Sequence, residues 1–275
     1  ATSVKQEMTF RDRHIGLSDD ERTLMLDTLG LRSMDELSDR VVPENIRKRT
    51  RMSLPQAISE HDALIELKTI ASKNQVVRSL IGQGYYHTLT PAVIQRNVLE
   101  NPAWYTAYTP YQPEISQGRL EALFNYQTMI VELTGMAVAN ASLLDEATAA
   151  AEAMTLCERS SKSKSNRFYV ANNLFAQTRA VIETRALPLD FDLVTFDPHH
   201  PPEFDDAFGL IVQYTGSDGS VVDLKSLIKQ AKDQGILTVV ASDILSLTML
   251  EGPGHFGADI CLGSTQRFGV PMGNG

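Results

Sequence analysis

The chain has 275 residues, 43% of them hydrophobic and 21% charged, with a formal charge of −9 at pH 7. This composition excludes a disordered chain, a collagen-like repeat and a disulfide-rich miniprotein, and the acidic balance argues against nucleic acid as a partner. No apolar run approaches the ~18 residues that span a bilayer, and two distant cysteines, Cys157 and Cys261, support neither a disulfide framework nor a cysteine-based zinc site.

Helix-capping patterns divide the first 80 residues into helices. A capping box at Ser18–Glu21 predicts the start of one helix, and Ser33–Glu36 repeats the device for a second. Ser59–Asp62 predicts the start of a third helix, which carries apolar residues at helical spacing. Residues 1–80 are therefore expected to form a helical N-terminal extension.

Residues 81–140 are expected to combine aromatic loops with a long helix. Tyr, Trp, Gly and Pro crowd into residues 82–118, although only 7% of the whole chain is aromatic. Such loops can face a ligand with their rings and hydroxyls, or their rings can only pack the loop onto the core. The amphipathic helix is predicted from about Gln117 to Thr134, with Gly135 closing it.

From residue 141 onward, apolar strands alternate with helices. The predicted strands cover Arg167–Ala171, Asp192–Phe196, Gly209–Tyr214, Leu237–Ala241 and Asp259–Leu262. The predicted helices cover Glu146–Arg159, Gln177–Ala186 and Leu224–Gln234. This alternation predicts an α/β domain over residues 141–275, with a mostly parallel sheet covered by helices on both faces. Ligands of such sheets bind beyond the carboxyl ends of the strands, where Asp243 and residues 264–267 fall.

Four long strings of residues carry a family resemblance. They are Tyr105–Gly118, Asn140–Glu146, Ala241–Asp243 and Gln266–Gly273. Through them the chain resembles the P-protein family of the glycine cleavage system, the glycine decarboxylases. The resemblance runs from Arg13 to the end and implies the N-terminal half of the long single-chain form, or much of the alpha subunit of the two-subunit form. It also implies fold type I of the pyridoxal phosphate (PLP)-dependent transferases, the aspartate aminotransferase-like large domain, incomplete at its C-terminus.

The resemblance assigns four positions around the PLP of such a fold. A site of this kind has a carboxylate on the pyridine nitrogen, a ring beside the cofactor, an anion cradle at a helix N-terminus and a Schiff-base Lys. By resemblance, Asp243 matches the carboxylate, Phe175 stands where the family usually has His, and Thr148 belongs to the cradle. Asp145 and Glu146 precede Thr148, and their carboxylates would repel a phosphate.

The Schiff-base position is expected to be lost. The resemblance puts Gln266 there, and an amide cannot form an imine. All nine lysines lie at or before Lys232, whereas the fold places its Lys after the residue that matches Asp243. The segment is therefore expected to be the half without linked PLP and to be inactive alone, with no catalytic residue and no metal ligand of its own.

The resemblance further implies an active site between two similar halves. Tyr108, Tyr111 and Gln112, with Ser116 behind them, would reach PLP and glycine on the C-terminal catalytic half or beta subunit. The full enzyme, an oxidoreductase named glycine dehydrogenase (aminomethyl-transferring), would decarboxylate glycine and pass the aminomethyl group to the lipoyl group of H-protein. A second protomer is the remaining expected partner, because an exposed aromatic cluster needs an interface to cover it.

Two alternatives stay open from the sequence alone. The chain could be a non-enzymatic pseudo-subunit that scaffolds or regulates a partner, or an independent enzyme that binds PLP reversibly and without a covalent bond. The expected protein is soluble and reduced, in the cytoplasm of a bacterium or the mitochondrial matrix of a eukaryote, with no membrane or nucleic-acid partner.

Overall fold

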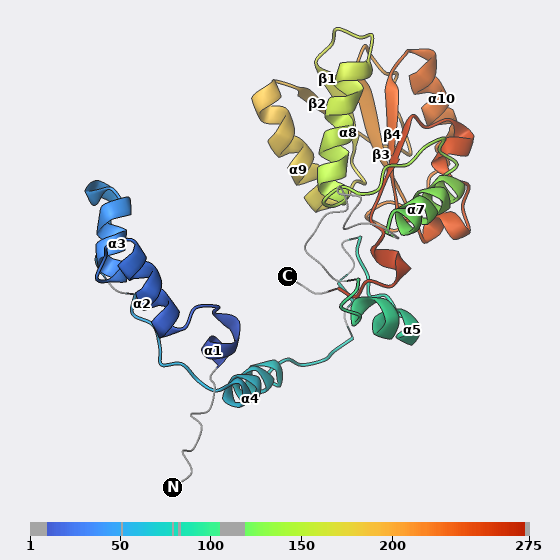
Figure 1. Cartoon of the computed structure of the whole chain (residues 1–275). Coiled ribbons are helices and arrows are strands. Elements are labelled where there is room, and N and C mark those ends of the chain that lie inside the picture. The colour runs from blue at the N-terminus through green and yellow to red at the C-terminus, as the bar shows by residue number, and fades with distance from the viewer. Residues whose placement is uncertain (1–9, 51, 79, 82–83, 105–118, 273–275) are drawn as a thin grey trace. The chain divides into compact units, whose positions relative to one another are not determined.

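The computed structural model describes residues 10–50, 52–78, 80–81, 84–104 and 119–272. Two compact units make up the chain, Ala1–Ser79 and Leu80–Gly275. Figure 1 shows the helices of the first unit and the sheet with its covering helices in the second.

The regular elements of the first unit, over its described residues, are helices. Its helices are α1 (Phe10–His14), α2 (Asp19–Thr28), α3 (Met34–Val41) and α4 (Glu60–Ala71), with a 3-10 turn at Glu44–Ile46. The predicted capping box is confirmed, because Ser18 Oγ accepts from the Glu21 N–H at 3.3 Å and the Glu21 carboxylate accepts from the Ser18 N–H at 2.8 Å. The hydroxyls of Ser33 and Ser59 cap α3 and α4 by accepting from the N–H groups of Glu36 and Asp62, but the predicted reciprocal bond is not formed at Ser33, where the Glu36 carboxylate accepts from the Arg32 N–H instead.

The second unit is built on a five-stranded sheet in which every pair of neighbouring strands is parallel. The strands are β1 (Arg167–Ala171), β2 (Asp192–Phe196), β3 (Gly209–Tyr214), β4 (Leu237–Ser242) and β5 (Ile260–Leu262). Their order across the sheet is β2-β1-β3-β4-β5. The predicted strands are confirmed, with β4 one residue longer than expected and β5 starting one residue later.

The second unit also contains helices. In chain order they are α5 (Ala92–Ile94), continued by a π-helical turn (Gln95–Leu99), then α7 (Arg119–Thr134), α8 (Glu146–Ser160), α9 (Ala176–Ala186) and α10 (Lys225–Asp233). Those that cover the sheet are α8, α9 and α10. Short 3-10 turns cover Leu187–Leu189, Ser246–Thr248, Pro253–Phe256 and Gln266–Phe268. Among the described residues, no helix has both the length and the apolar content needed to cross a membrane.

Helices lie on both faces of the sheet, as predicted (Figure 1). Side chains of α8 and α9 share one core cluster with Phe168 and Val170 of β1. Side chains of α10 share the other cluster with Tyr169 and Ala171 of the same strand. Successive residues of a strand point to opposite faces, so a sheet covered on both sides needs an apolar residue at almost every position.

The C-terminal end of α7 approaches the rest of the unit closely. Gly135 ends the helix with φ +70°, and a Cβ added at Gly254 would lie 2.1 Å from the Gly135 carbonyl oxygen. A Cβ added at Gly252 would lie 2.6 Å from the carbonyl oxygen of Thr134. Backbones can approach this closely only where side chains are absent. The contact fixes the end of α7 against the turn that precedes β5.

Candidate functional site

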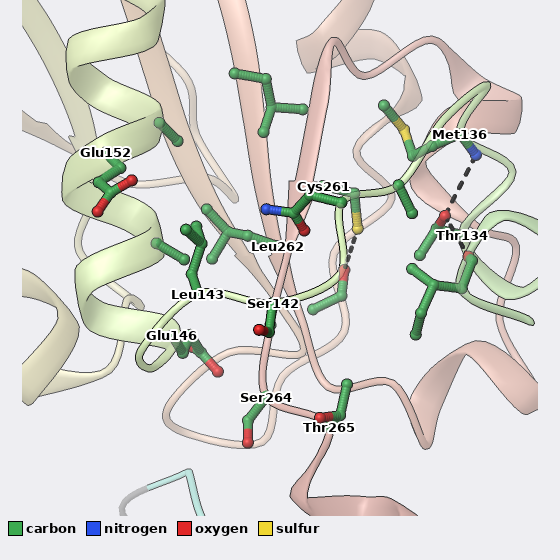
Figure 2. A pocket seen from close by; sticks show the side chains of 18 of the residues that line it. Thr134, Met136, Ser142, Leu143, Glu146, Glu152, Cys261, Leu262, Ser264 and Thr265 are labelled. Atoms are coloured by element: carbon green, nitrogen blue, oxygen red, sulfur yellow. Dashed lines mark hydrogen bonds between the residues drawn. The ribbon is translucent and has the colours of Figure 1, made fainter. Parts of the chain in front are cut away.

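Polar residues gather where the parallel strands end. Asp243 follows β4 directly, and residues 264–267 follow β5. The edge formed by the carboxyl ends of parallel strands is where α/β proteins bind ligands. Figure 2 shows Glu146, in the first turn of α8, and Ser264, just after β5, on one pocket of about 930 Å³. The first turn of α8 therefore belongs to the same region.

The carboxylate of Asp243 is paired with Arg267. Arg267 Nη2 donates to Asp243 Oδ2 at 2.8 Å, and Nε lies 3.2 Å from each carboxylate oxygen. The side chains of Arg267 and Asp243 are only 14% and 17% exposed. The guanidinium carbon also lies 5.0 Å from the centre of the Tyr86 ring, within the range of a cation–π contact. A cation of the same chain thus already neutralises this carboxylate.

The side-chain amide of Gln266 is bound to backbone carbonyls. Its Nε2 donates to Tyr86 O at 3.1 Å and to Val270 O at 2.9 Å. The first bond joins Gln266 to residues 84–90, which we call the cover segment. Gln266 therefore has neither the amine that a Schiff base requires nor a free amide.

The ring of Phe175 is covered by the cover segment. Phe175 is buried, and the Tyr85 ring lies 5.7 Å from it at an angle of 59°. A Cβ added at Gly84 would lie 2.6 Å from three atoms of the Phe175 ring. Gly84 has φ +90°, a conformation that favours glycine. The aromatic face expected beside a cofactor is therefore in contact with the chain itself.

The N-terminus of α8 is capped by a carboxylate. Asp145 Oδ1 accepts from the Thr148 N–H at 2.7 Å. A side-chain carboxylate at this position accepts from an N–H group that has no partner within the helix, and its negative charge interacts favourably with the helix dipole. A phosphate bound here would need the N–H group that Asp145 already occupies.

Glu146, the next residue, is a buried acid. Glu146 is only 4% exposed. Its Oε1 has no hydrogen-bond partner within the part of the chain that the structure describes. Burial raises the pKa of Glu146 to about 7, and the charge of Asp243 adds to the rise. Hydrogen bonds from Gln213, the Ser264 backbone and Tyr85 oppose that rise. A carboxyl with a pKa near 7 can lose or hold a proton at neutral pH.

Other buried polar side chains near this edge each have one polar atom without a hydrogen-bond partner among the described residues. Asn173 Nδ2 donates to Gln213 O at 3.4 Å, and Gln213 Nε2 donates to Ala241 O at 3.2 Å. Among the described residues, the buried side-chain atoms without a hydrogen-bond partner are Glu146 Oε1, Asn173 Oδ1, Thr178 Oγ1 and Gln213 Oε1. The two amide oxygens among them, Asn173 Oδ1 and Gln213 Oε1, can only accept, so they offer nothing to an anion.

Together these contacts do not fit PLP. The carboxylate that would hold the pyridine nitrogen is paired with Arg267. The ring face is covered, the helix N-terminus is capped by Asp145, and Gln266, which we expect at the Schiff-base position, carries an amide bound to backbone carbonyls. The structure therefore brings Asp243, Phe175 and Gln266 into contact with groups of the same chain, and none of them is available to the cofactor.

The predicted interface residues lie outside the described residues. They are Tyr108, Tyr111, Gln112 and Ser116. Both ends of this stretch are described, and Arg119 Nη2 donates to Ala103 O at 2.8 Å, which brings the two ends together. Across the described ranges, no group of three or more His, Cys, Asp or Glu side chains is placed to hold a metal ion.

Sequence reasoning placed Arg267 and Glu146 in this region but predicted neither the ion pair of Arg267 nor the burial of Glu146. Arg267 follows the strand next to the one that Asp243 follows, and this adjacency could have indicated an ion pair. Glu146 lies four residues before the fully buried Ala150 on an alanine-rich helix. Residues four apart share one helix face, so that spacing could have indicated burial.

Comparisons with known proteins agree on one family. A family model described as Glycine cleavage system P-protein matches residues 12–275. The chain is 57% identical over 267 residues to glycine dehydrogenase (decarboxylating) of Nitrobacter winogradskyi and 55% identical over 268 residues to that of Nostoc punctiforme. These alignments cover 97% of this chain, 28% of the first relative and 27% of the second.

A solved structure is also similar. It is the crystal structure of glycine decarboxylase (P-protein) of the glycine cleavage system in an inhibitor-bound form, with 34% identity and a TM-score of 0.84. The match covers 94% of this chain and 60% of that one. The chain thus spans little more than a quarter of the length of the curated relatives that it matches.

Proposed function

Because the chain belongs to the glycine cleavage system P-protein family, we propose that it is one part of a glycine decarboxylase, the half without linked PLP. The observation that carries this proposal is the bonding of Gln266, at the position that the family resemblance makes the Schiff-base position. Gln266 stands there with its amide bound to backbone carbonyls, and the neighbouring Arg267 is paired with Asp243. A half of this kind contributes to catalysis by completing a site that another half holds.

The reaction proposed for the whole enzyme is the decarboxylation of glycine. PLP on the complementary half, a C-terminal half or a beta subunit, would supply the electron sink for that step. The lipoyl group of H-protein would accept the aminomethyl group, and a second protomer would complete the assembly. The bacterial relatives favour the cytoplasm over the mitochondrial matrix as the location.

This chain would contribute side chains that orient glycine. Tyr108, Tyr111 and Gln112 carry hydroxyl and amide groups, with Ser116 behind them. Such groups can hold a small zwitterion in place without adding charge. Holding the scissile bond in one orientation lowers the barrier without any covalent role for this half.

Replacing Tyr111 by Phe in the assembled enzyme tests the proposal. Loss of one hydrogen bond to substrate is worth roughly 1–3 kcal/mol, so the rate of glycine decarboxylation should fall about tenfold to a hundredfold. The PLP content and the unfolding temperature should stay unchanged. Tyr169→Phe is the matched control, because Tyr169 is buried in the sheet core and its hydroxyl accepts from the Asp205 N–H.

The control variant should keep the wild-type rate. If Tyr111→Phe also keeps it, the loop does not touch the reacting groups. The completed, self-contained contacts of Asp243 and Phe175 would then favour a non-enzymatic pseudo-subunit that scaffolds its partner.

A further inference from the structure

Glu146 lies where four parts of the second unit meet. It belongs to the first turn of α8, and its carboxyl accepts from the side chain of Gln213 on β3 and from the N–H of Ser264 after β5. The fourth part is the cover segment, whose Tyr85 hydroxyl also donates to this carboxyl. Despite these donors, Oε1 has no hydrogen-bond partner among the described residues. The carboxyl is thus enclosed on several sides, with one oxygen left without a donor.

These surroundings suit the protonated acid better than the carboxylate. An ionised carboxylate needs donors or water at both oxygens, whereas the neutral acid brings no charge into the interior. The charge of Asp243 repels a second negative charge at Glu146, and Arg267 is already paired with Asp243. Asp145, which caps the same helix, adds another carboxylate at this point. Water would therefore have to reach Glu146 to stabilise its ionised form.

The C-terminal end of the cover segment is attached by bonds that do not titrate near neutral pH. Thr88 Oγ1 donates to Val270 O at 2.9 Å, and Thr90 Oγ1 donates to Gly269 O at 2.5 Å. Both bonds join a neutral hydroxyl to a backbone carbonyl, so a change in pH near neutrality leaves them intact.

The N-terminal end of the cover segment is attached differently. Gly84 and the Tyr85 ring lie against Phe175, and the Tyr85 hydroxyl donates to Glu146. Burial raises the pKa of the Tyr85 hydroxyl, which therefore stays a hydrogen-bond donor at neutral pH. The group at this end whose charge can change near neutral pH is thus the carboxyl of Glu146.

We propose that Glu146 is a pH-dependent switch for the Gly84–Tyr85 end of the cover segment, which covers the protonated acid and moves away when the acid ionises. The bonds of Thr88 and Thr90 keep the other end in place, so the opening is local. A rise in pH would uncover the Phe175 ring and the first turn of α8. This inference goes beyond the proposed function, because it concerns only contacts within this chain.

Proton linkage gives the direction and the size of the effect. In the covered state, burial raises the pKa of Glu146 to about 7 from the ordinary value of 4.5. Since the open state restores the ordinary pKa, ionisation favours opening. The ratio of open to covered molecules should therefore rise about tenfold between pH 6 and pH 8.

A cysteine introduced beneath Tyr85 can measure this opening. Thr178 is fully buried beside Tyr85, and its Oγ1 has no hydrogen-bond partner among the described residues, so Thr178→Cys removes no such bond. The rate at which iodoacetamide labels this cysteine in the full chain would be measured at pH 6 and pH 8. Peptide mapping separates its label from that of Cys157, which lies fully buried in the core and reports unfolding of the whole unit.

The intrinsic reactivity of a thiol also rises with pH, so the labelling rates need a reference. The first reference is the same cysteine combined with Glu146→Gln, because glutamine stays neutral. From pH 6 to pH 8, labelling of Thr178→Cys should rise about tenfold more than labelling of this double variant. An unfolded peptide with the same cysteine gives the intrinsic rise directly, so the test does not depend on the folding of Glu146→Gln.

Glu152→Gln, combined with Thr178→Cys, is the matched control. It makes the same chemical change at an exposed position of α8. Because Glu146 is still present in this variant, the additional tenfold rise in labelling should remain.

Two results would overturn the proposal. One is a rise in labelling from pH 6 to pH 8 that is no larger in Thr178→Cys than in its references. The other is labelling of the introduced cysteine only as fast as that of Cys157, because the opening would then be unfolding of the whole unit.

Discussion

The interior of the sheet and its carboxyl edge differ in the contacts that their side chains make. Inside, β3 is buried over its whole length, and core clusters fill both faces. At the edge, Asp243 binds Arg267, Asp145 caps a helix, and Phe175 lies under the cover segment. The interior of a fold can persist while the chemistry of its edge is replaced, because packing depends on apolar area and ligand binding on a few polar groups.

The difference also shows in what each region leaves unsatisfied. The strands exchange regular hydrogen bonds across the sheet. The edge holds four buried polar atoms that have no partner among the described residues, Glu146 Oε1 among them. Buried polar groups without partners lower the stability of the fold, so their presence at the edge indicates that stability alone does not determine which residues stand there.

The largest expected effect tests the interior. Phe168 is fully buried and stacks on Phe208 with ring centres 5.2 Å apart. Phe168→Ala should lower the free energy of unfolding by about 3–5 kcal/mol, through lost burial and a residual cavity. Denaturant unfolding measures this. Phe124→Ala, at a 66% exposed position on α7, should change stability by no more than about 0.5 kcal/mol. Equal effects of the two changes would contradict the assignment of the core.

The next effect tests the edge through Glu146. Its pKa rises from 4.5 to about 7 in the folded state, so folding favours the protonated acid. Its stabilising contribution is complete below about pH 4.5 and is lost as the pH rises through about 7. A pKa difference of one unit corresponds to about 1.36 kcal/mol, so the full loss in the free energy of unfolding is roughly 3 kcal/mol.

Glu146→Gln removes this dependence, because glutamine stays neutral. Relative to the wild type, the variant should gain stability between pH 5 and pH 8, up to roughly 3 kcal/mol. Unfolding by denaturant at both pH values measures the difference. Glu152→Gln makes the same chemical change at an exposed position of α8 and is the control for loss of a carboxylate from this helix. Identical pH profiles for Glu146→Gln and the wild type would show that the acid is solvated.

The interior could be predicted from the sequence because its signals are local. Apolar runs such as Gly209–Tyr214 predict buried strands directly. The helices of the first unit were predictable for the same reason, because capping residues such as Ser18 identify helix starts within one turn. That position 266 carries an amide and not an amine is visible in the sequence itself, and its assignment to the Schiff-base position stays a prediction.

The contacts of the edge could not be read in the same way. The pairing of Asp243 with Arg267 depends on the 3-10 turn that directs the guanidinium, and the covering of Phe175 brings together residues distant in sequence. Neither follows from a periodic pattern, because both depend on tertiary packing. Glu146 lies between these cases, since helical spacing indicates its burial and only the fold shows its unpaired oxygen.

We infer from the contacts of Asp243, Phe175 and Asp145 that this chain does not hold PLP, and reduction with borohydride can test this inference. The wild-type chain and its Gln266→Lys variant would each be mixed with PLP, reduced, digested and mapped. The account predicts no stoichiometric pyridoxyl-lysine in either protein, because Arg267, Asp145 and the cover segment already occupy the groups that would bind the cofactor. A stoichiometric label on one specific lysine of the wild type would contradict the account. A label only on the lysine of Gln266→Lys would show that the missing amine alone prevents binding.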